Sequence, residues 1–205
     1  VGAGHSRLDG KLDFLAELSA CAGEKPVLSC SPASYTPPDT LEENPLPTVR
    51  RVLPFFPEGN IRGRGEALQR VPEHPLNAAF VAAGFVFADS DVIREVPYDP
   101  YLYFDQEEIT YAARLYTHGW DVFSARRPLL YHYYNTGGRD AARPLHWQDL
   151  RKENEQKIRF LKERGLKRFN HLTGFRATDD LEAVKELGRY GFGEAGTLGP
   201  FERYS

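Results

Sequence analysis

Methionine is absent from this chain of 205 residues, and cysteine occurs only twice, as Cys21 and Cys30. Two cysteines are too few for a disulfide framework, so we expect both to be reduced core residues in a cytoplasmic protein. No spacing of histidine and cysteine matches a zinc motif. Because a natural reading frame starts with methionine and this chain starts with Val1, we expect a processed form or a part of something longer.

The chain also lacks an excess of positive charge and a long apolar run. It has 26 Lys and Arg residues and 29 Asp and Glu residues, which give a formal net charge of −3. This charge argues against a general nucleic-acid interface. No apolar stretch approaches the ~18 residues of a membrane span, and the start shows no signal-peptide pattern. The composition is 41% hydrophobic and 27% charged, which suits one large domain with a buried core.

Short apolar runs predict the strands of a sheet. They lie at 25–30, 77–90, 120–123 and 128–134. The run 77–90 is almost wholly apolar, which is typical of a central strand buried on both faces, and Gly84 within it allows close approach to the backbone. The segment 31–75 holds nine of the 15 prolines, so we expect an ordered loop or irregular hairpin that lines a site.

Helical patterns alternate with these strands and dominate the C-terminal part. Helices are expected at 9–21, 105–118, 147–164, 165–172 and 178–188. In the first of them, Leu12, Leu15 and Leu18 define the apolar face, together with Phe14 and Cys21. The order of elements predicts an α/β fold class, in a single domain over 1–205.

The helix expected after Asp105 begins with two adjacent carboxylates. Asp105 suits the N-cap, Glu108 lies three positions on as in a capping box, and Gly119 ends the helix. Glu107 is not needed for that cap. It either meets the positive end of the helix dipole, worth about 0.3–1 kcal/mol, or directs a carboxylate into a pocket.

Other candidate site residues also have structural interpretations. His132, in an apolar strand, is either a core residue or a metal ligand, and Asp99 is either a turn aspartate or a catalytic carboxylate. Arg62 and Arg64 lie beside glycines, in a solvated turn or in a phosphate-binding loop. Because no nucleophile-elbow motif and no Ser-His-Asp order is present, the chemistry that remains is that of carboxylates, histidines and a divalent metal.

Residues 80–134 carry motifs that resemble a known enzyme family. The motifs are AAGFVFA, VPYDPYLYFDQEE, ARLYTHGWD and HYY, and they are similar to the signature of the cytoplasmic N-acetylglucosaminyltransferases that modify hydroxyproline. They are more distantly similar to the polypeptide GalNAc-transferases. The resemblance extends to AGHSRLDGKLDFLAEL near the start and RYGFGEAGTLGPFERYS at the end, so it covers nearly the whole chain. It implies a GT-A fold, of which this chain is the C-terminal portion with a helical extension, and a retaining sugar transfer.

The resemblance also implies ligands and site residues. The donor would be a UDP-sugar, most simply UDP-GlcNAc, the acceptor a hydroxyl of a protein or glycan, and the cofactor Mn²⁺ or Mg²⁺. Imidazole favours Mn²⁺, and His5 and His132 match the metal-binding histidines. Glu107 would contact the donor sugar or the acceptor, with Glu108 and Asp99 as further catalytic candidates. The expected substrate-binding residues are Gly84, Phe85, Arg7, Trp120, Arg62 and Arg64.

Departures from the family pattern keep other functions open. Ala3 stands where the family has a metal-binding aspartate, and Gln106 stands where it has a glycine. The part of the family that binds the nucleotide base precedes the matched segment. The alternatives to an active transferase are therefore an impaired relative that acts as a binding module, or a fragment that needs a further segment.

Overall fold

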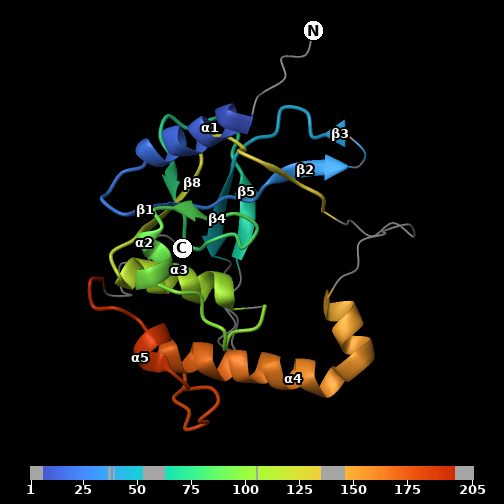
Figure 1. The fold of residues 1–205 in the computed structure, drawn as a ribbon, viewed down its shortest axis with the longest axis vertical. Coiled ribbons are helices and arrows are strands. Elements are labelled where there is room, and N and C mark those ends of the chain that lie inside the picture. Colours follow the sequence, from blue (N-terminus) through green and yellow to red (C-terminus); the bar gives the residue numbers. More distant parts are fainter. Residues whose placement is uncertain are drawn as a thin grey trace.

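The computed structural model describes residues 7–36, 38, 40–52, 63–104, 106–134 and 146–196, without the side chains of 7–12 and 146–153. It is a mixed α/β structure (Figure 1). The helices are α1 (Arg7–Ser19), α2 (Asp91–Glu95), α3 (Glu107–Thr117), α4 (His146–Leu172) and α5 (Leu187–Tyr190). The strands are β1 (Pro26–Leu28), β2 (Ala33–Thr36), β3 (Thr40–Leu41), β4 (Thr48–Val52), β5 (Gly63–Ala67), β6 (Leu76–Asn77), β7 (Phe87–Ala88), β8 (Asp121–Ser124) and β9 (Tyr131–His132).

The central sheet has the strand order β6-β8-β1-β7. Its inner strands β1 and β8 are parallel, with Val27 opposite Val122, and its outer strands are antiparallel to them. Since side chains alternate along a strand, Val27 and Val122 enter one core while Leu28 and Phe123 enter another. The short central strands are therefore buried on both faces.

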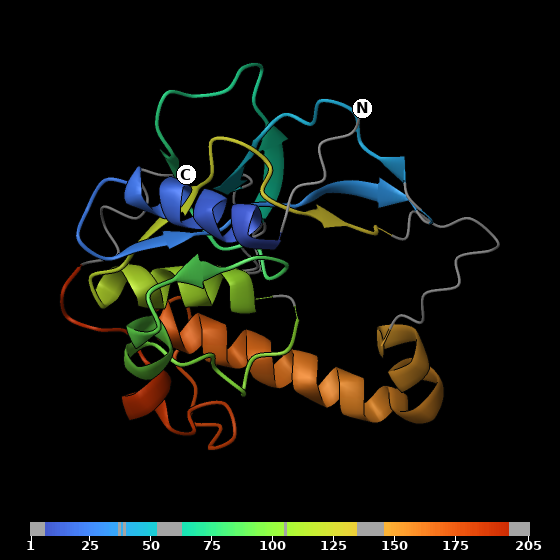
Figure 2. The same ribbon diagram turned by 45° about the horizontal axis from the view of Figure 1, so that its top comes forward.

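Helices cover both faces of this sheet. Figures 1 and 2 show α1 on one face, α3 on the other, and α4 beyond α3. The core under α1 is built around Leu28, Phe85 and Phe123, with Phe14 and Leu18 of the helix packed against it. The core under α3 is larger and reaches Phe169 of α4.

Both inner strands continue past the sheet as a second parallel pair. The chain of β1 leads into β2, that of β8 leads into β9, and Ser34 pairs with His132. The antiparallel hairpin β4–β5 is attached to the apolar segment after β6, where Ala79 N–H donates to Arg50 O at 3.2 Å. This hairpin lies within the proline-rich segment, as predicted, and residues 53–62 lie outside the described structure.

Several predicted elements are confirmed. α1, β1, α3, β8 and β9 lie where the patterns predicted them, and Gly119 ends α3 with a φ of +83°. Cys21 and Cys30 are both free thiols, and burial raises their pKa values to about 12 and about 11. Among the residues that the structure describes, no helix is long and apolar enough to cross a membrane.

The predicted continuous strand 77–90 is wrong. Only its ends pair, as β6 and β7, while residues 78–86 form an irregular chain that is buried at 78–82 and 85 and exposed at 83, 84 and 86. Ser29 explains part of this, since its hydroxyl accepts from Ala82 N–H and donates to Phe85 O, which holds these residues in a turn. A continuous apolar run indicates that much of a segment is buried, but burial alone does not determine that the segment is a strand.

The C-terminal helices also differ from the prediction. The predicted break between 147–164 and 165–172 is absent, and α4 is instead divided by a kink at Asn154, where φ is −160° and ψ is 83°. Most of the predicted helix 178–188 is turns followed by the short α5. Side chains compete with the helix there, because Thr178 Oγ1 accepts from Asp180 N–H and Asp180 Oδ1 accepts from Glu182 N–H.

Candidate functional site

The start of α3 lies beside the ends of the parallel strands. Glu108 in the first turn of α3 accepts from Ala83 N–H, and the neighbouring Ala82 is held by Ser29 directly after β1, so α3 starts at the carboxyl end of the parallel strands. β1 ends at the same edge because it is parallel to β8. Ligands in open α/β sheets bind at such carboxyl ends.

A tight turn over Ala82–Phe85 presents its tip at this edge. Phe85 N–H donates to Ala82 O at 2.9 Å. Ser29, fully buried after β1, accepts from Ala82 N–H at 2.7 Å and donates to Phe85 O at 2.7 Å. Gly84 at the tip is exposed, and a Cβ there would meet nothing closer than the Pro32 ring at 3.7 Å. The buried Ser29 therefore fixes the turn on its protein side, while the Gly84 backbone is accessible from the solvent side.

Glu108 joins this turn to α3 and to the β4–β5 hairpin. Its Oε1 accepts from Ala83 N–H at 2.7 Å, and its Oε2 accepts from Arg50 Nη2 at 2.8 Å. The predicted capping box is wrong: α3 begins at Glu107 after Gln106 as N-cap, and Asp105 lies outside the described residues. Both oxygens of Glu108 accept hydrogen bonds from residues far away in the sequence, and one of these partners, Arg50, is charged.

Glu107 and Tyr98 lie next to Glu108. Glu107 is half-buried, and Tyr98 packs on Tyr111 of α3 with ring centroids 4.6 Å apart. Burial raises the pKa of Tyr98, and the charges of Glu107 and Glu108 raise it further. Tyr98 is 46% exposed, and its hydroxyl can act as a hydrogen-bond donor at the surface.

His132 and Tyr134 reach the same turn through Pro32. The two rings lie 4.5 Å apart, and Tyr134 Oη donates to Pro32 O at 2.9 Å. Burial raises the pKa of Tyr134, and the charge of Arg50 partly offsets this rise. We call the surface formed by Glu107, Glu108, Gly84, His132 and Tyr134 the Gly84 strip.

The proposed metal pair includes His5, which lies outside the described residues. Within the described residues, no group of three or more His, Cys, Asp or Glu side chains is arranged to hold a metal ion. His132 itself is half-buried on β9 beside Tyr134. The ligand set thus stays a prediction.

Three of the predicted site residues are buried against other parts of the protein. Phe85 is in the core under α1, 5.6 Å from the ring of Phe14. Trp120 precedes β8, at the opposite end of the sheet from the Gly84 strip, and is 2% exposed. Asp99, with 5% exposure, forms an ion pair with Arg168 of α4.

Of the three predicted arginines, only Arg64 has a described side chain. Arg7 begins α1, and its side chain is not described. Arg62 lies outside the described residues, and Arg64 is exposed on β5 opposite Arg51. The residues that sequence reasoning missed are Ser29, Arg50 and Tyr98; no local pattern marks the first two, whereas Tyr98 lies in the VPYDP motif.

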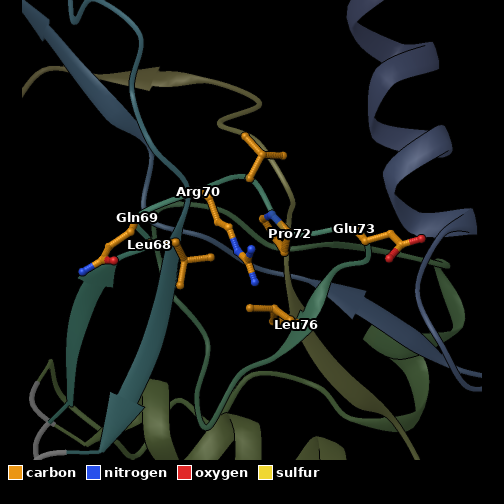
Figure 3. A pocket seen from close by; sticks show the side chains of 7 residues that line it. Leu68, Gln69, Arg70, Pro72, Glu73 and Leu76 are labelled. Atoms are coloured by element: carbon orange, nitrogen blue, oxygen red, sulfur yellow. The ribbon is translucent and has the colours of Figure 1, made fainter.

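Two hollows are lined by residues other than those of the turn. One, of about 570 Å³, is lined by Leu68, Gln69, Arg70, Val71, Pro72, Glu73 and Leu76, as Figure 3 shows. The other, of about 240 Å³, lies beside Lys25, Glu95 and Trp120, at the amino end of the parallel strands. The first contains no predicted site residue, and the second contains only Trp120.

The family model described as Glycosyltransferase (GlcNAc) matches residues 5–205. The chain belongs to this family. It is therefore a glycosyltransferase, an enzyme that moves a sugar from a donor to an acceptor. The match includes every predicted site residue of this GlcNAc glycosyltransferase family member, from His5 to His132. No curated protein and no solved structure matches the chain.

Proposed function

We propose that this glycosyltransferase transfers GlcNAc from UDP-GlcNAc to a hydroxyl of a protein or glycan, with retention of anomeric configuration, at the Gly84 strip. A GT-A relationship and a kinship with the hydroxyproline-modifying enzymes are part of the proposal. The observation that carries it is the Ala82–Phe85 turn, which holds an exposed glycine at the carboxyl end of the parallel strands beside two carboxylates.

An exposed glycine backbone suits a sugar ring. The absence of a side chain at Gly84 lets a pyranose lie directly against the peptide, and Ser29 and Glu108 keep that peptide from moving. Glu107 lies at the first position of α3, where a carboxylate can accept hydrogen bonds from sugar hydroxyls. Tyr98, which packs on Tyr111 of the same helix, offers a hydroxyl donor.

The transfer itself needs no protein nucleophile. The bond between the anomeric carbon and the donor phosphate oxygen breaks, and a bond to the acceptor oxygen forms on the same face. The acceptor proton passes to the departing phosphate oxygen. In this scheme Glu107 orients the sugar or the acceptor near the anomeric carbon, and the protein contributes mainly positioning and electrostatic stabilisation.

A divalent cation held by His5 and His132 is part of the same proposal. When bound, it would place positive charge against the leaving diphosphate. We expect chelation to abolish transfer and Mn²⁺ to restore it. In Mn²⁺ titrations followed by electron paramagnetic resonance, His132→Ala should bind the ion more weakly than the unchanged protein; equal binding would rule His132 out as a ligand.

The test is UDP release from UDP-GlcNAc by the full-length protein with Mn²⁺, followed by NMR of the anomeric configuration in the product. Glu107→Ala should abolish UDP release with little loss of stability, while Glu163→Ala, an exposed glutamate on α4, should change neither. An inverted product contradicts the retaining mechanism. Full activity of Glu107→Ala contradicts the assignment of the site.

The second candidate function is a binding module without transfer. Ala3, in place of the family's metal-binding aspartate, favours it. Calorimetry with UDP-GlcNAc separates the two functions, because a binding module binds the donor with no UDP release over many hours, whereas an enzyme turns it over.

A further inference from the structure

Arg50 reaches the proposed site from outside the central sheet. It lies on β4, and its Nη2 donates to Glu108 Oε2 at 2.8 Å. Its guanidinium carbon lies 4.9 Å from the centroid of the Phe80 ring. The side chain is 16% exposed and that of Glu108 is 28% exposed, so the pair is partly shielded from water. An ion pair in this setting is screened less than one on the open surface.

The position of the Arg50 side chain is fixed by its surroundings. Its carbonyl oxygen accepts from Ala79 N–H, which ties β4 to the chain that leads into the turn. The Phe80 ring that it stacks on also packs tightly against Gly63 of the paired strand β5. A planar guanidinium held on an aromatic face keeps its donors in a fixed direction, here toward Glu108.

Burial of Arg50 is not explained by stability alone. Its Nε is buried and has no hydrogen-bond partner within the described residues. Buried donors without partners are rare because they are unfavourable. The favourable contacts of this guanidinium go instead to one carboxylate, whose other oxygen holds Ala83 N–H next to the exposed Gly84.

We propose that Arg50 is a positioning residue of the transferase, which acts through Glu108 to hold the Gly84 peptide against the donor sugar. The proposal rests on the function proposed above, because it requires the sugar to lie at the turn. With Arg50 in place, the Glu108 carboxylate stays directed at Ala83 N–H. Without it, the carboxylate turns toward water and the turn loses its outer anchor, while Ser29 still holds the ends.

Hydrogen exchange followed by mass spectrometry tests the first step without any activity. Exchange of a peptide that covers Ala82–Phe85 should speed up about tenfold in Arg50→Ala, since its acceptor Glu108 is no longer held. The matched control is Arg51→Ala, the next residue on the same strand, which is 45% exposed and lies 3.9 Å from Glu66. Equal exchange in the two variants overturns the proposal.

Donor kinetics test the second step through a double-mutant cycle. Arg50→Ala and Glu108→Gln should each raise the KM for UDP-GlcNAc about tenfold, and the double variant should be no worse than either one, because both remove the same support. Arg50→Lys should recover part of the loss, since it restores the charge but not the stacked fork. Additive losses in the double variant would mean that Arg50 contacts the donor directly, and this overturns the proposal.

The two proposals fail in different ways. If the full-length protein releases no UDP, the proposed function fails, and the exchange experiment still decides whether Arg50 holds the turn. If the protein is active and Glu107→Ala abolishes transfer, but Arg50→Ala matches Arg51→Ala in both exchange and KM, only the role of Arg50 is wrong.

Discussion

Replacing Asp99 with asparagine removes one negative charge from a pair that is almost wholly shielded from water. The side chains of Asp99 and Arg168 are 2% and 0% exposed, and Arg168 Nε donates to Asp99 Oδ2 at 2.7 Å. Asp99 Oδ1 also accepts from Tyr101 N–H, and Arg168 Nη1 donates to the carbonyl oxygens of Ala183 and Lys185. This network ties the connector before α3 to α4 and to the C-terminal turns.

The expected loss of stability follows from the uncompensated cation. Removing one partner of a buried ion pair costs about 3–5 kcal/mol, because the other charge stays buried without its counter-ion. For a protein of this size, with a urea dependence of roughly 2.5 kcal/mol per molar, the unfolding midpoint of Asp99→Asn should fall by about 1–2 M. Circular dichroism in urea measures this shift.

Lys167→Ala provides the matched control on the same helix. Lys167 pairs with Asp180, but the two side chains are 51% and 32% exposed, so its removal should change stability by less than about 1 kcal/mol. UDP release is then measured well below the unfolding midpoint of each variant. If Asp99→Asn unfolds within about 0.3 M urea of the unchanged protein and yet loses transfer, the structural reasoning is refuted and Asp99 is catalytic.

Two further predictions concern the packing of the hairpin and the acid limb of stability. Gly63→Ala should destabilise by about 1–3 kcal/mol, because the new Cβ would overlap the Phe80 ring; thermal unfolding measures the loss. The hydrogen bond from Lys25, and next that from Trp120, lower the pKa of Glu95 from its usual 4.5. The charged Glu95 carboxylate therefore stabilises the fold fully above that pH, and this stabilisation is lost as the pH falls through the lowered pKa of the folded state. Trp120 fluorescence should therefore change below about pH 4.5, and Glu95→Gln should remove that transition.

Each of these has its own control. Gly65→Ala, on the same strand, places a Cβ 3.4 Å from Ser31 Oγ and should be tolerated far better; equal losses in the two glycine variants would contradict the packing argument. The fluorescence experiment uses a Trp147→Phe background, which leaves Trp120 as the only tryptophan. A transition that persists in Glu95→Gln would assign it to another group.

Helix α1 shows how far periodicity carries a prediction. The helix lies where the leucine spacing predicted it, but its buried side is formed by Phe14, Glu17 and Leu18, while Leu15 is 43% exposed. Glu17 is 1% exposed because Arg126, after β8, donates to its carboxylate from backbone and side chain. A charged residue on the inner face depends on a partner 109 positions away, which no local pattern contains.

The paired carboxylates of α3 show the same limit at the site. The sequence predicted a helix here, with Glu108 as part of its cap and Glu107 either at the positive end of the helix dipole or directed into a pocket. The helix is present, and Glu107 remains a candidate, but Glu108 bonds Ala83 and Arg50, which come 25 and 58 positions earlier in the chain. The motif pattern marked both glutamates as important and could not assign their separate contacts.

The sequence by itself determined the α/β class, the positions of α1, α3 and the inner strands, the free cysteines, and membership of a glycosyltransferase family. These follow from local periodicity, composition and motifs, which are properties of neighbouring residues. Tertiary structure alone decided that the apolar run after β6 bends into a turn, that Asp99 is buried against Arg168, and that Arg50 reaches Glu108. Those outcomes depend on hydrogen bonds and ion pairs between distant segments, whose partners are chosen only when the chain has folded.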